Sequence, residues 1–416
     1  MAMRDSGDVP IHWPEEGPSR VPYSVYSDPE IHRREVDRIF RGPLWHFLCL
    51  EIEIPEPGDW RTGWVGEIPV VVTRDLDGSV HALVNRCAHK GALVCLEERG
   101  HGRQLTCIYH AWSYDLRGNL KGLAFRNGVN GRGGMPEDFD ISARRLEPLR
   151  VESFCGLVFG TFQADTPPLE DYLGERMAGF IRRNFGRPLK VIGRHSQILH
   201  NNWKLYAENI RDSYHATVLH TFYTTFKVNR LDMDGGIVMS EDGRHHVSYA
   251  KRATLKEAAE YREADVHSIR YDSQLAAPEL LAAWDEFDDG ITHSIQSVFP
   301  TLGLQNTLNS LAVRFFRPLG PDKMEIDWIY LGAEDDSADE ADMRTLQANL
   351  TGAAGFVSLE DGCINEFVQR GTAGSAEAAA FMEMGGREIE SSENSRATET
   401  AIRGFWRGYR EVMELE

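Results

Sequence analysis

The first part of the chain alternates hydrophobic and polar positions over short intervals that are broken by tight turns. Residues 69–73 and 79–84 are largely apolar runs on either side of an Asp-Leu-Asp-Gly turn, which predicts an antiparallel hairpin. A second hairpin is expected around residues 112–119. A glycine-rich loop over 128–136 then interrupts the pattern before one more strand. We therefore expect an all-β domain over residues 44–163.

Helical periodicity begins only after Thr166, where two consecutive prolines mark a plausible domain boundary. Helices are expected over residues 169–185, 203–215, 337–367 (interrupted near Gly352 and Gly355) and 397–413. Strands return at 243–250 and 311–318. Strands followed by mixed helices and strands indicate an α+β fold. The second domain is expected to comprise residues 164–416 together with residues 1–43.

Composition and charge limit the possible partners. The 416 residues are 42% hydrophobic and 26% charged, a globular balance sufficient for two or three domains. The net charge of -19 argues against nucleic acid or an anionic membrane, and an anionic substrate would need locally placed cations. No secretory signal and no membrane span is expected, so we expect a cytoplasmic protein. In that compartment four cysteines are expected to be buried free thiols: Cys49, Cys95, Cys155 and Cys363.

Two short motifs could bind a metal cluster. Cys87 and His89 are followed, after seventeen intervening residues, by Cys107 and His110. Two thiolates on one iron and two imidazoles on the other are the ligands of a Rieske [2Fe–2S] centre. Two cysteines and two histidines also form structural zinc sites, but the order Cys-His then Cys-His differs from that of a zinc finger. The position of both motifs after strand-like runs favours the iron–sulfur interpretation.

A second candidate metal site surrounds His215 and His220. Five residues apart, they diverge on an unbroken helix, so the helix must distort or end between them if both bind one metal. A carboxylate would complete the triad typical of non-heme Fe(II). Glu360 and Asp361 are the candidates, because an unpaired acid in their otherwise apolar helical segment would be costly; spacing does not choose between them. Asp212 either orients a ligand, accepts a hydrogen bond from a cluster imidazole or lies on the surface.

Two arginines are candidates for substrate binding. Arg314 lies within the apolar strand 311–316, so its side chain either reaches outward or binds an anion inside. Arg396 is expected at the start of the last helix, where free backbone N–H groups could help it to bind a carboxylate. A surface salt bridge is the alternative for each arginine.

These residues resemble those of the large (α) subunits of Rieske non-heme iron ring-hydroxylating oxygenases, over essentially the whole chain. The resemblance is carried by Arg86-Cys87-Ala88-His89-Lys90-Gly91, Cys107-Ile108-Tyr109-His110-Ala111-Trp112, and Asn202-Trp203-Lys204 followed by Glu208, Asn209, Asp212, His215 and His220. It implies an all-β Rieske domain and a helix-grip-like catalytic domain, whose large antiparallel sheet is flanked by helices. It implies that Asp361, not Glu360, completes the iron triad, and it places Asn209 among the catalytic residues. Lys90 and Ala111 depart from the family, which usually has arginine and glycine there, and either could alter the potential of the cluster.

The resemblance also implies partners and a reaction. In the family, the aspartate matching Asp212 bridges to a cluster histidine of the neighbouring chain, within an α3β3 hexamer that contains a small (β) subunit. A separate reductase supplies electrons from NADH, and O2 is the co-substrate. Arg314 and Arg396 match positions that contact a substrate carboxylate, which implies an aromatic dicarboxylate such as terephthalate. An ortho-substituted benzoate, such as salicylate or anthranilate, is the alternative. The expected product is a cis-dihydrodiol.

Three other functions stay open at this point. A Rieske monooxygenase would add one oxygen atom to its product instead of two. A pure electron-transfer protein would hold the cluster and no mononuclear iron. A zinc-stabilised binding module would hold zinc and no sulfide.

Overall fold

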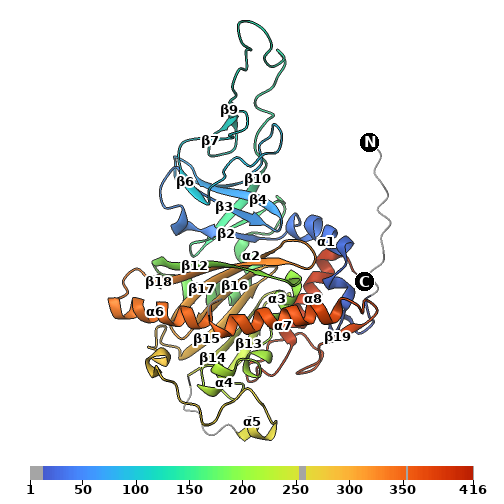
Figure 1. Cartoon of the computed structure of the whole chain (residues 1–416), viewed down its shortest axis with the longest axis vertical. Coiled ribbons are helices and arrows are strands. Elements are labelled where there is room, and N and C mark those ends of the chain that lie inside the picture. Colours follow the sequence, from blue (N-terminus) through green and yellow to red (C-terminus); the bar gives the residue numbers. More distant parts are fainter. Residues whose placement is uncertain (1–12, 253–258, 353–354, 416) are drawn as a thin grey trace.

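The computed structural model describes residues 13–252, 259–352 and 355–415. Its first part is a seven-stranded antiparallel sheet with the order β2-β11-β10-β5-β4-β3-β6, beyond which a small sheet of order β7-β8-β9 projects (Figure 1). The strands are β2 (His46–Leu50), β3 (Asp59–Val65), β4 (Ile68–Arg74), β5 (Val80–Val84), β6 (Arg99–His101), β7 (Leu105–Thr106), β8 (Ser113–Tyr114), β9 (Leu120–Gly122), β10 (Pro148–Phe154) and β11 (Leu157–Thr161). Both expected hairpins are confirmed, because β4 pairs with β5 and β8 pairs with β9 in antiparallel register.

The second part is built on another seven-stranded antiparallel sheet, with the order β12-β18-β17-β16-β15-β14-β13. Its strands are β12 (Leu189–Leu199), β13 (Gly235–Met239), β14 (His246–Lys251), β15 (Ile291–Val298), β16 (Leu302–Thr307), β17 (Ser310–Pro318) and β18 (Met324–Ala333). Its helices are α2 (Leu169–Phe185), α3 (Trp203–Asn209), α4 (Thr221–Thr225), α5 (Ala259–Glu263), α6 (Ala338–Thr351), α7 (Phe356–Thr372) and α8 (Thr400–Met413). The α+β architecture expected from the sequence is therefore present.

Helices cover both faces of this second sheet. Met177 of α2 shares a core with Val313 of β17, whereas Trp203 of α3 shares a different core with Ala312 and Phe316 of the same strand. Because successive side chains of a strand point to opposite faces, Arg314 lies on the side of Ala312 and Phe316. Figure 1 shows α6 and α7 crossing this side of the sheet. Because its side chains alternate in direction, β17 thus places Arg314 in the layer between the sheet and the helices.

The amino-terminal segment is attached to helices α3 and α8 of the second part by a buried polar cluster. This segment contains α1 (Pro29–Glu35), and a short strand β1 (Arg20–Pro22) that pairs with β19 (Ala379–Phe381). Glu35 is fully buried and accepts hydrogen bonds from Lys204 Nζ at 2.5 Å, Trp203 Nε1 at 2.8 Å and the Tyr409 hydroxyl at 2.6 Å. A buried carboxylate with three donors is satisfied, so it fixes α1 against α3 and α8.

Two helices differ from the sequence-based expectation. The helix expected over 203–215 ends at Asn209, because the Asp212 side chain accepts hydrogen bonds from the backbone N–H groups of Tyr214 and His215. Such local bonds compete with helical ones and turn the chain. The last helix begins at Thr400, so Arg396 precedes it and does not lie in its first turn. The expectation that free backbone N–H groups in the first turn of this helix assist Arg396 is therefore wrong.

The cysteines outside the two motifs are free thiols that differ in exposure. Cys49 and Cys95 are buried as expected, whereas Cys155 is half-buried and Cys363 is exposed, so the expectation of buried thiols is wrong for these two.

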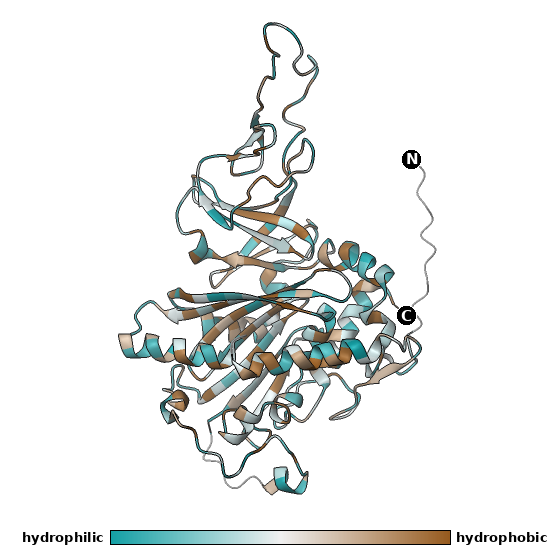
Figure 2. Cartoon of the chain, viewed as in Figure 1, coloured by the Kyte–Doolittle hydropathy of each residue, from teal (hydrophilic) through white to brown (hydrophobic). Residues whose placement is uncertain are grey.

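Hydrophobic residues concentrate on the strands of both sheets, whereas α6 and α7 carry both hydrophilic and hydrophobic positions (Figure 2). Within the described ranges, no helix combines the length and the apolar character needed to cross a bilayer.

Candidate metal centres and active-site pocket

The two Cys-His motifs form a pair of equivalent loops in the first part of the chain. The first loop follows β5 and the second connects β7 to β8. In the first, the N–H of Gly91 donates to the carbonyl of Cys87; in the second, the N–H of Ala111 donates to that of Cys107. Gly91 and Ala111 both have positive φ, of 79° and 52°. Ala111 therefore occupies a left-handed conformation that usually favours glycine.

The four candidate ligands face one another across these loops. Cys87 and Cys107 are buried, while the rings of His89 and His110 lie at the edge with their centroids 4.5 Å apart. The Trp112 ring stacks on His89 at 4.9 Å. Thiolates inside and imidazoles at the rim are the arrangement expected of an asymmetric cluster with one iron nearer to solvent.

This donor set fits a two-iron cluster better than a single ion. The Nδ1 atom of His89 is buried and has no hydrogen-bond partner, as expected of an atom kept for a metal. The four side chains do not bring their ligand atoms together at one point. Among the described residues, the only set of three or more potential metal ligands that does so lies in the second part of the chain. A tetrahedral zinc site requires that convergence. The Tyr114 hydroxyl lies 3.2 Å from Cys87 Sγ and could donate to a cluster thiolate.

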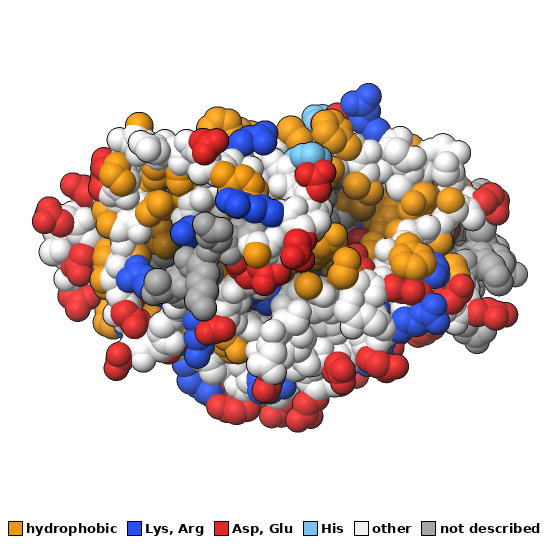
Figure 3. All heavy atoms as spheres, turned by 90° about the horizontal axis from the view of Figure 1, so that it is seen from below, with side chains coloured by type: hydrophobic (Ala, Val, Ile, Leu, Met, Phe, Trp, Pro, Cys, Tyr) orange, Lys and Arg blue, Asp and Glu red, His pale blue; other side chains and the backbone are white. Residues whose placement is uncertain are grey.

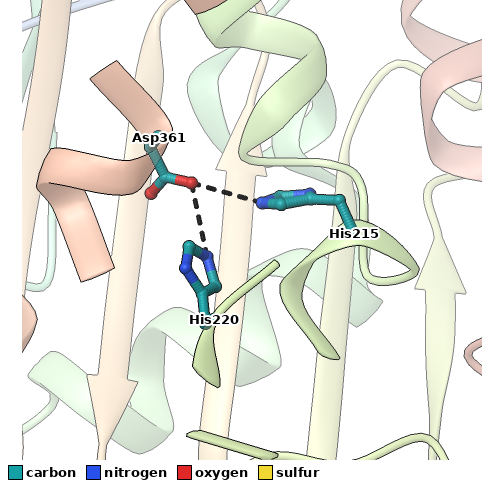
Figure 4. Close-up of side chains that lie close together, drawn as sticks. All are labelled: His215, His220 and Asp361. Atoms are coloured by element: carbon teal, nitrogen blue, oxygen red, sulfur yellow. Dashed lines mark hydrogen bonds and ion pairs between the residues drawn. The ribbon is translucent and has the colours of Figure 1, made fainter. Parts of the chain in front are cut away.

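The convergent group consists of His215, His220 and Asp361 (Figure 4). Asp361 Oδ1 lies 3.2 Å from His215 Nε2 and 3.3 Å from His220 Nε2, and the three ligand atoms lie within 4.8 Å of one another. His215 begins a short 3-10 turn and His220 is the N-cap of α4, so the helix breaks between them as expected. Two imidazoles and one carboxylate on one side of a point fit a facial iron site.

Neighbouring side chains hold the three ligands. Glu360 Oε2 lies 2.7 Å from His220 Nδ1, Asp212 Oδ2 lies 3.4 Å from His215 Nδ1, and Asn209 Nδ2 donates to Asp361 Oδ1 at 3.1 Å. The hydrogen bond from Glu360 orients the His220 ring and directs its inner nitrogen toward the metal position, whereas Asp212 lies at ion-pair distance from the outer nitrogen of His215. The contact of Glu360 was not anticipated, and no sequence signal separates it from a surface acid.

The electrostatics of the triad suit a cation. Burial alone would lower the pKa of His215, but the carboxylates of Asp212 and Asp361 raise it to about 10. Burial opposes ionisation of Asp361, yet the two histidines hold its pKa well below the usual range. The two histidines thus hold protons beside the ionised carboxylate of Asp361, at the position where a divalent metal would bind.

A pocket beside the triad contains one of the two candidate arginines. Arg314 lines it together with the three ligands, and its Nη1 donates to the Tyr206 hydroxyl at 3.3 Å. Its Nε and Nη2 atoms have no partner although the residue is only 3% exposed. Arg396 is also buried but lies behind the wall, where its guanidinium donates to Asn229 Oδ1 and the carbonyl of Arg230. Among the described residues, no carboxylate lies within salt-bridge distance of either arginine.

Further polar residues of the pocket could not be found from the sequence. Asn229, Ser248, His293 and Gln305 line the same pocket. They come from separate strands and loops, and no local spacing connects them. Burial, together with the charges of Arg396 and Arg314, lowers the pKa of His293 to about 3, so its ring is neutral in the pocket.

Comparison with known proteins agrees with this geometry. Residues 44–130 match the Rieske [2Fe-2S] domain and residues 187–415 the catalytic domain of the ring hydroxylating alpha subunit. The chain is 48% identical over 406 residues to the terephthalate 1,2-dioxygenase terminal oxygenase component subunit alpha 2 of Comamonas sp, covering 98% of both chains. It is 43% identical to the anthranilate 1,2-dioxygenase large subunit of Burkholderia cepacia, covering 99% of this chain and 97% of that one. Naphthalene 1,2-dioxygenase of Rhodococcus sp. shares the fold, with a TM-score of 0.79 at 24% identity over 95% and 94% of the two chains.

The Rieske domain implies a [2Fe–2S] cluster, and the catalytic domain implies a mononuclear iron. These two cofactors suit the two donor sets described above. The chain therefore belongs to the ring-hydroxylating dioxygenases, as an alpha subunit that joins a Rieske domain to a mononuclear iron domain.

Proposed function

We propose that this alpha subunit dihydroxylates an aromatic carboxylic acid with O2 to give a cis-dihydrodiol, and that the acid is an aromatic dicarboxylate such as terephthalate. The observation that carries the proposal is Arg314, a buried guanidinium with two unpartnered N–H donor atoms in the pocket of the iron triad. A buried cation is costly without an anionic partner, and a substrate carboxylate would supply one. The name of the relative from Comamonas supports the same class of substrate.

The proposal assigns the ligands as follows. Cys87, His89, Cys107 and His110 hold the cluster, and His215, His220 and Asp361 hold the iron. When bound, these centres supply electrons and activate O2, which is chemistry that no side chain provides. Asn209 and Asp212 keep the ligand atoms in place through their contacts with Asp361 and His215.

The remaining role of the protein is to orient the ring. Arg314 projects from β17, a rigid central strand, so a carboxylate held by its fork has a fixed position relative to the triad. The surface itself is acidic: acidic side chains are prominent along the edges of the face shown in Figure 3. Attraction of an anionic substrate therefore depends on the buried arginine rather than on the surface.

We further propose the partners and the division of the chain. A reductase that oxidises NADH would supply electrons, and a small (β) subunit would complete an α3β3 hexamer. The side chain of Asp212 is 20% exposed and contacts His215, so it is placed to connect the iron site with a cluster histidine of a neighbouring chain. The Rieske domain would span residues 44–163, and the catalytic domain residues 1–43 and 164–416.

Turnover of a panel of acids tests the function. With reductase and NADH, we expect terephthalate to be preferred over isophthalate, phthalate, salicylate and anthranilate, with two atoms from labelled O2 in each product. Arg314→Ala should lose most activity, while Arg317→Ala, three residues along β17 and paired with Glu325, is the control. Preference for an ortho-substituted benzoate would support the alternative substrate. One labelled atom per product would indicate a monooxygenase, and full activity of Arg314→Ala would refute the carboxylate contact.

A further inference from the structure

Asn229 and Arg396 form a buried pair in which only the asparagine reaches the active-site pocket. Arg396 is 1% exposed and Asn229 is 2% exposed. Asn229 lines the pocket together with the triad, whereas Arg396 lies behind it and donates to Asn229 Oδ1. A second N–H of Arg396 donates to the carbonyl of Arg230, so the guanidinium is held from two sides.

This pairing determines which end of the Asn229 amide is free. A guanidinium has only donors, so the amide oxygen must face Arg396 and the assignment of oxygen and nitrogen is not arbitrary. The Nδ2 group therefore points away from Arg396, on a side chain that lines the pocket. Asn229 therefore offers the pocket an N–H donor, and the charge of Arg396 polarises that donor from behind.

The pocket has a second set of free donors at Arg314. Its Nε and Nη2 atoms are unpartnered. Among the residues that the structure describes, the only acidic side chains lining the pocket are Asp361 of the triad and Asp212, which contacts His215. The unpartnered N–H groups of Arg314, together with the amide of Asn229, therefore suit the acidic groups of a ligand.

We propose that Asn229 is a specificity-determining residue, held in position by Arg396, whose amide donates a hydrogen bond to the second carboxylate of the substrate while Arg314 binds the first. This inference rests on the proposed function of the site. An aminobenzoate has no second carboxylate to accept a hydrogen bond from this amide, so the arrangement favours a dicarboxylate. It also assigns different roles to the two buried arginines: Arg314 contacts the ligand directly, and Arg396 acts through Asn229.

The test compares terephthalate with benzoate, which lacks the second carboxylate. Dissociation constants are measured on the iron-loaded enzyme with its cluster intact. Asn229→Leu removes the donor at similar volume, and we expect the dissociation constant of terephthalate to rise about tenfold or more while that of benzoate changes less than about twofold. Asn349→Leu, on the exposed side of α6, is the control.

A second variant tests the same interaction in case Asn229→Leu does not fold. Asn229→Asp has the same shape and can pair with Arg396, so it should fold, and it should repel the second carboxylate with the same selective loss of terephthalate binding. Arg396→Gln should reduce the terephthalate preference as well. The double variant Asn229→Leu/Arg396→Gln should lose little more than either single variant, because both changes remove one interaction.

The binding results distinguish failure of this inference from failure of the proposed function. Equal losses for the two acids, or unchanged terephthalate affinity in both Asn229 variants, would overturn the inference. If the unaltered enzyme bound neither acid, the proposed function itself would be wrong.

Discussion

The Nδ1 atom of His220 lies 2.7 Å from Oε2 of Glu360, while Nε2 of the same ring lies 3.3 Å from Oδ1 of Asp361. Two consecutive acidic residues of α7 therefore contact the two nitrogens of one imidazole. Because Glu360 accepts the Nδ1 proton, the lone pair of Nε2 is directed toward the point where the triad converges. The two acids, which spacing could not distinguish, have different contacts.

Glu360→Gln should weaken binding of the mononuclear iron without removing a ligand. Loss of the carboxylate reduces the basicity of the His220 ring, and changes of this kind lower metal affinity by about 10- to 100-fold. The measurement is iron and sulfide content after dialysis against a chelator, where the ratio of iron to sulfide should fall. Glu366→Gln, on the same helix and paired only loosely with Arg370, is the control. Equal iron retention in both variants would argue against a role for Glu360.

Affinity for Fe(II) should rise steeply with pH. Burial lowers the pKa of His215, but Asp212 and Asp361 outweigh it and raise the pKa to about 10, so the metal-free ring is protonated at neutral pH. Iron must displace that proton, which makes the apparent affinity increase by up to about tenfold per pH unit between pH 6 and 8. Fe(II) titration of the iron-depleted protein at three pH values measures this slope. A flat profile would contradict protonation of His215.

Tyr114→Phe should lower the reduction potential of the cluster. The Tyr114 hydroxyl lies 3.2 Å from Cys87 Sγ, and a hydrogen bond to a ligand sulfur stabilises the more negative, reduced cluster. Redox titration followed by the visible spectrum gives the potential. Tyr109→Phe is the control, because Tyr109 is 59% exposed and lies beside His110 without such a bond. An unchanged potential in Tyr114→Phe would show that the hydroxyl does not donate to the cluster.

Glu208→Gln should make stability less dependent on pH. Burial raises the pKa of Glu208 to about 8, although the Tyr26 hydroxyl donates to it at 2.5 Å. The folded state then binds the proton more tightly than the unfolded state, so stability present below pH 4.5 is lost as pH rises toward 8, by at most ~1.4 kcal/mol per pH unit. Glutamine cannot ionise, so the variant should gain relative to the parent protein between pH 5 and 8.

Unfolding midpoints of both proteins across this range measure that difference. Glu175→Gln, exposed on α2, should follow the parent protein at every pH. A constant difference between parent and Glu208→Gln would mean that Glu208 does not titrate in this window.

Local patterns predicted the elements well where they depended on neighbours in the chain. The helix Leu169–Phe185 has the expected bounds, and the interruption near Gly352 and Gly355 separates α6 from α7. The helix that begins at Trp203 is shorter than predicted. Nothing in the hydrophobic pattern shows that the Asp212 side chain will accept hydrogen bonds from the backbone that follows it. A helix end set by one side chain is invisible to periodicity.

The sequence by itself predicted the chemistry of the two centres, because a cluster and a mononuclear iron require particular ligand types at short spacings. The predicted pairs are Cys87 with His89, Cys107 with His110, and His215 with His220. Only the tertiary structure decided how distant residues combine. In the folded chain Asp361 lies beside the two histidines, and Glu360 contacts the outer nitrogen of His220. Asn229, rather than Arg396, lines the pocket. These relationships depend on how helices and strands far apart in the chain pack together, and no local spacing records that packing.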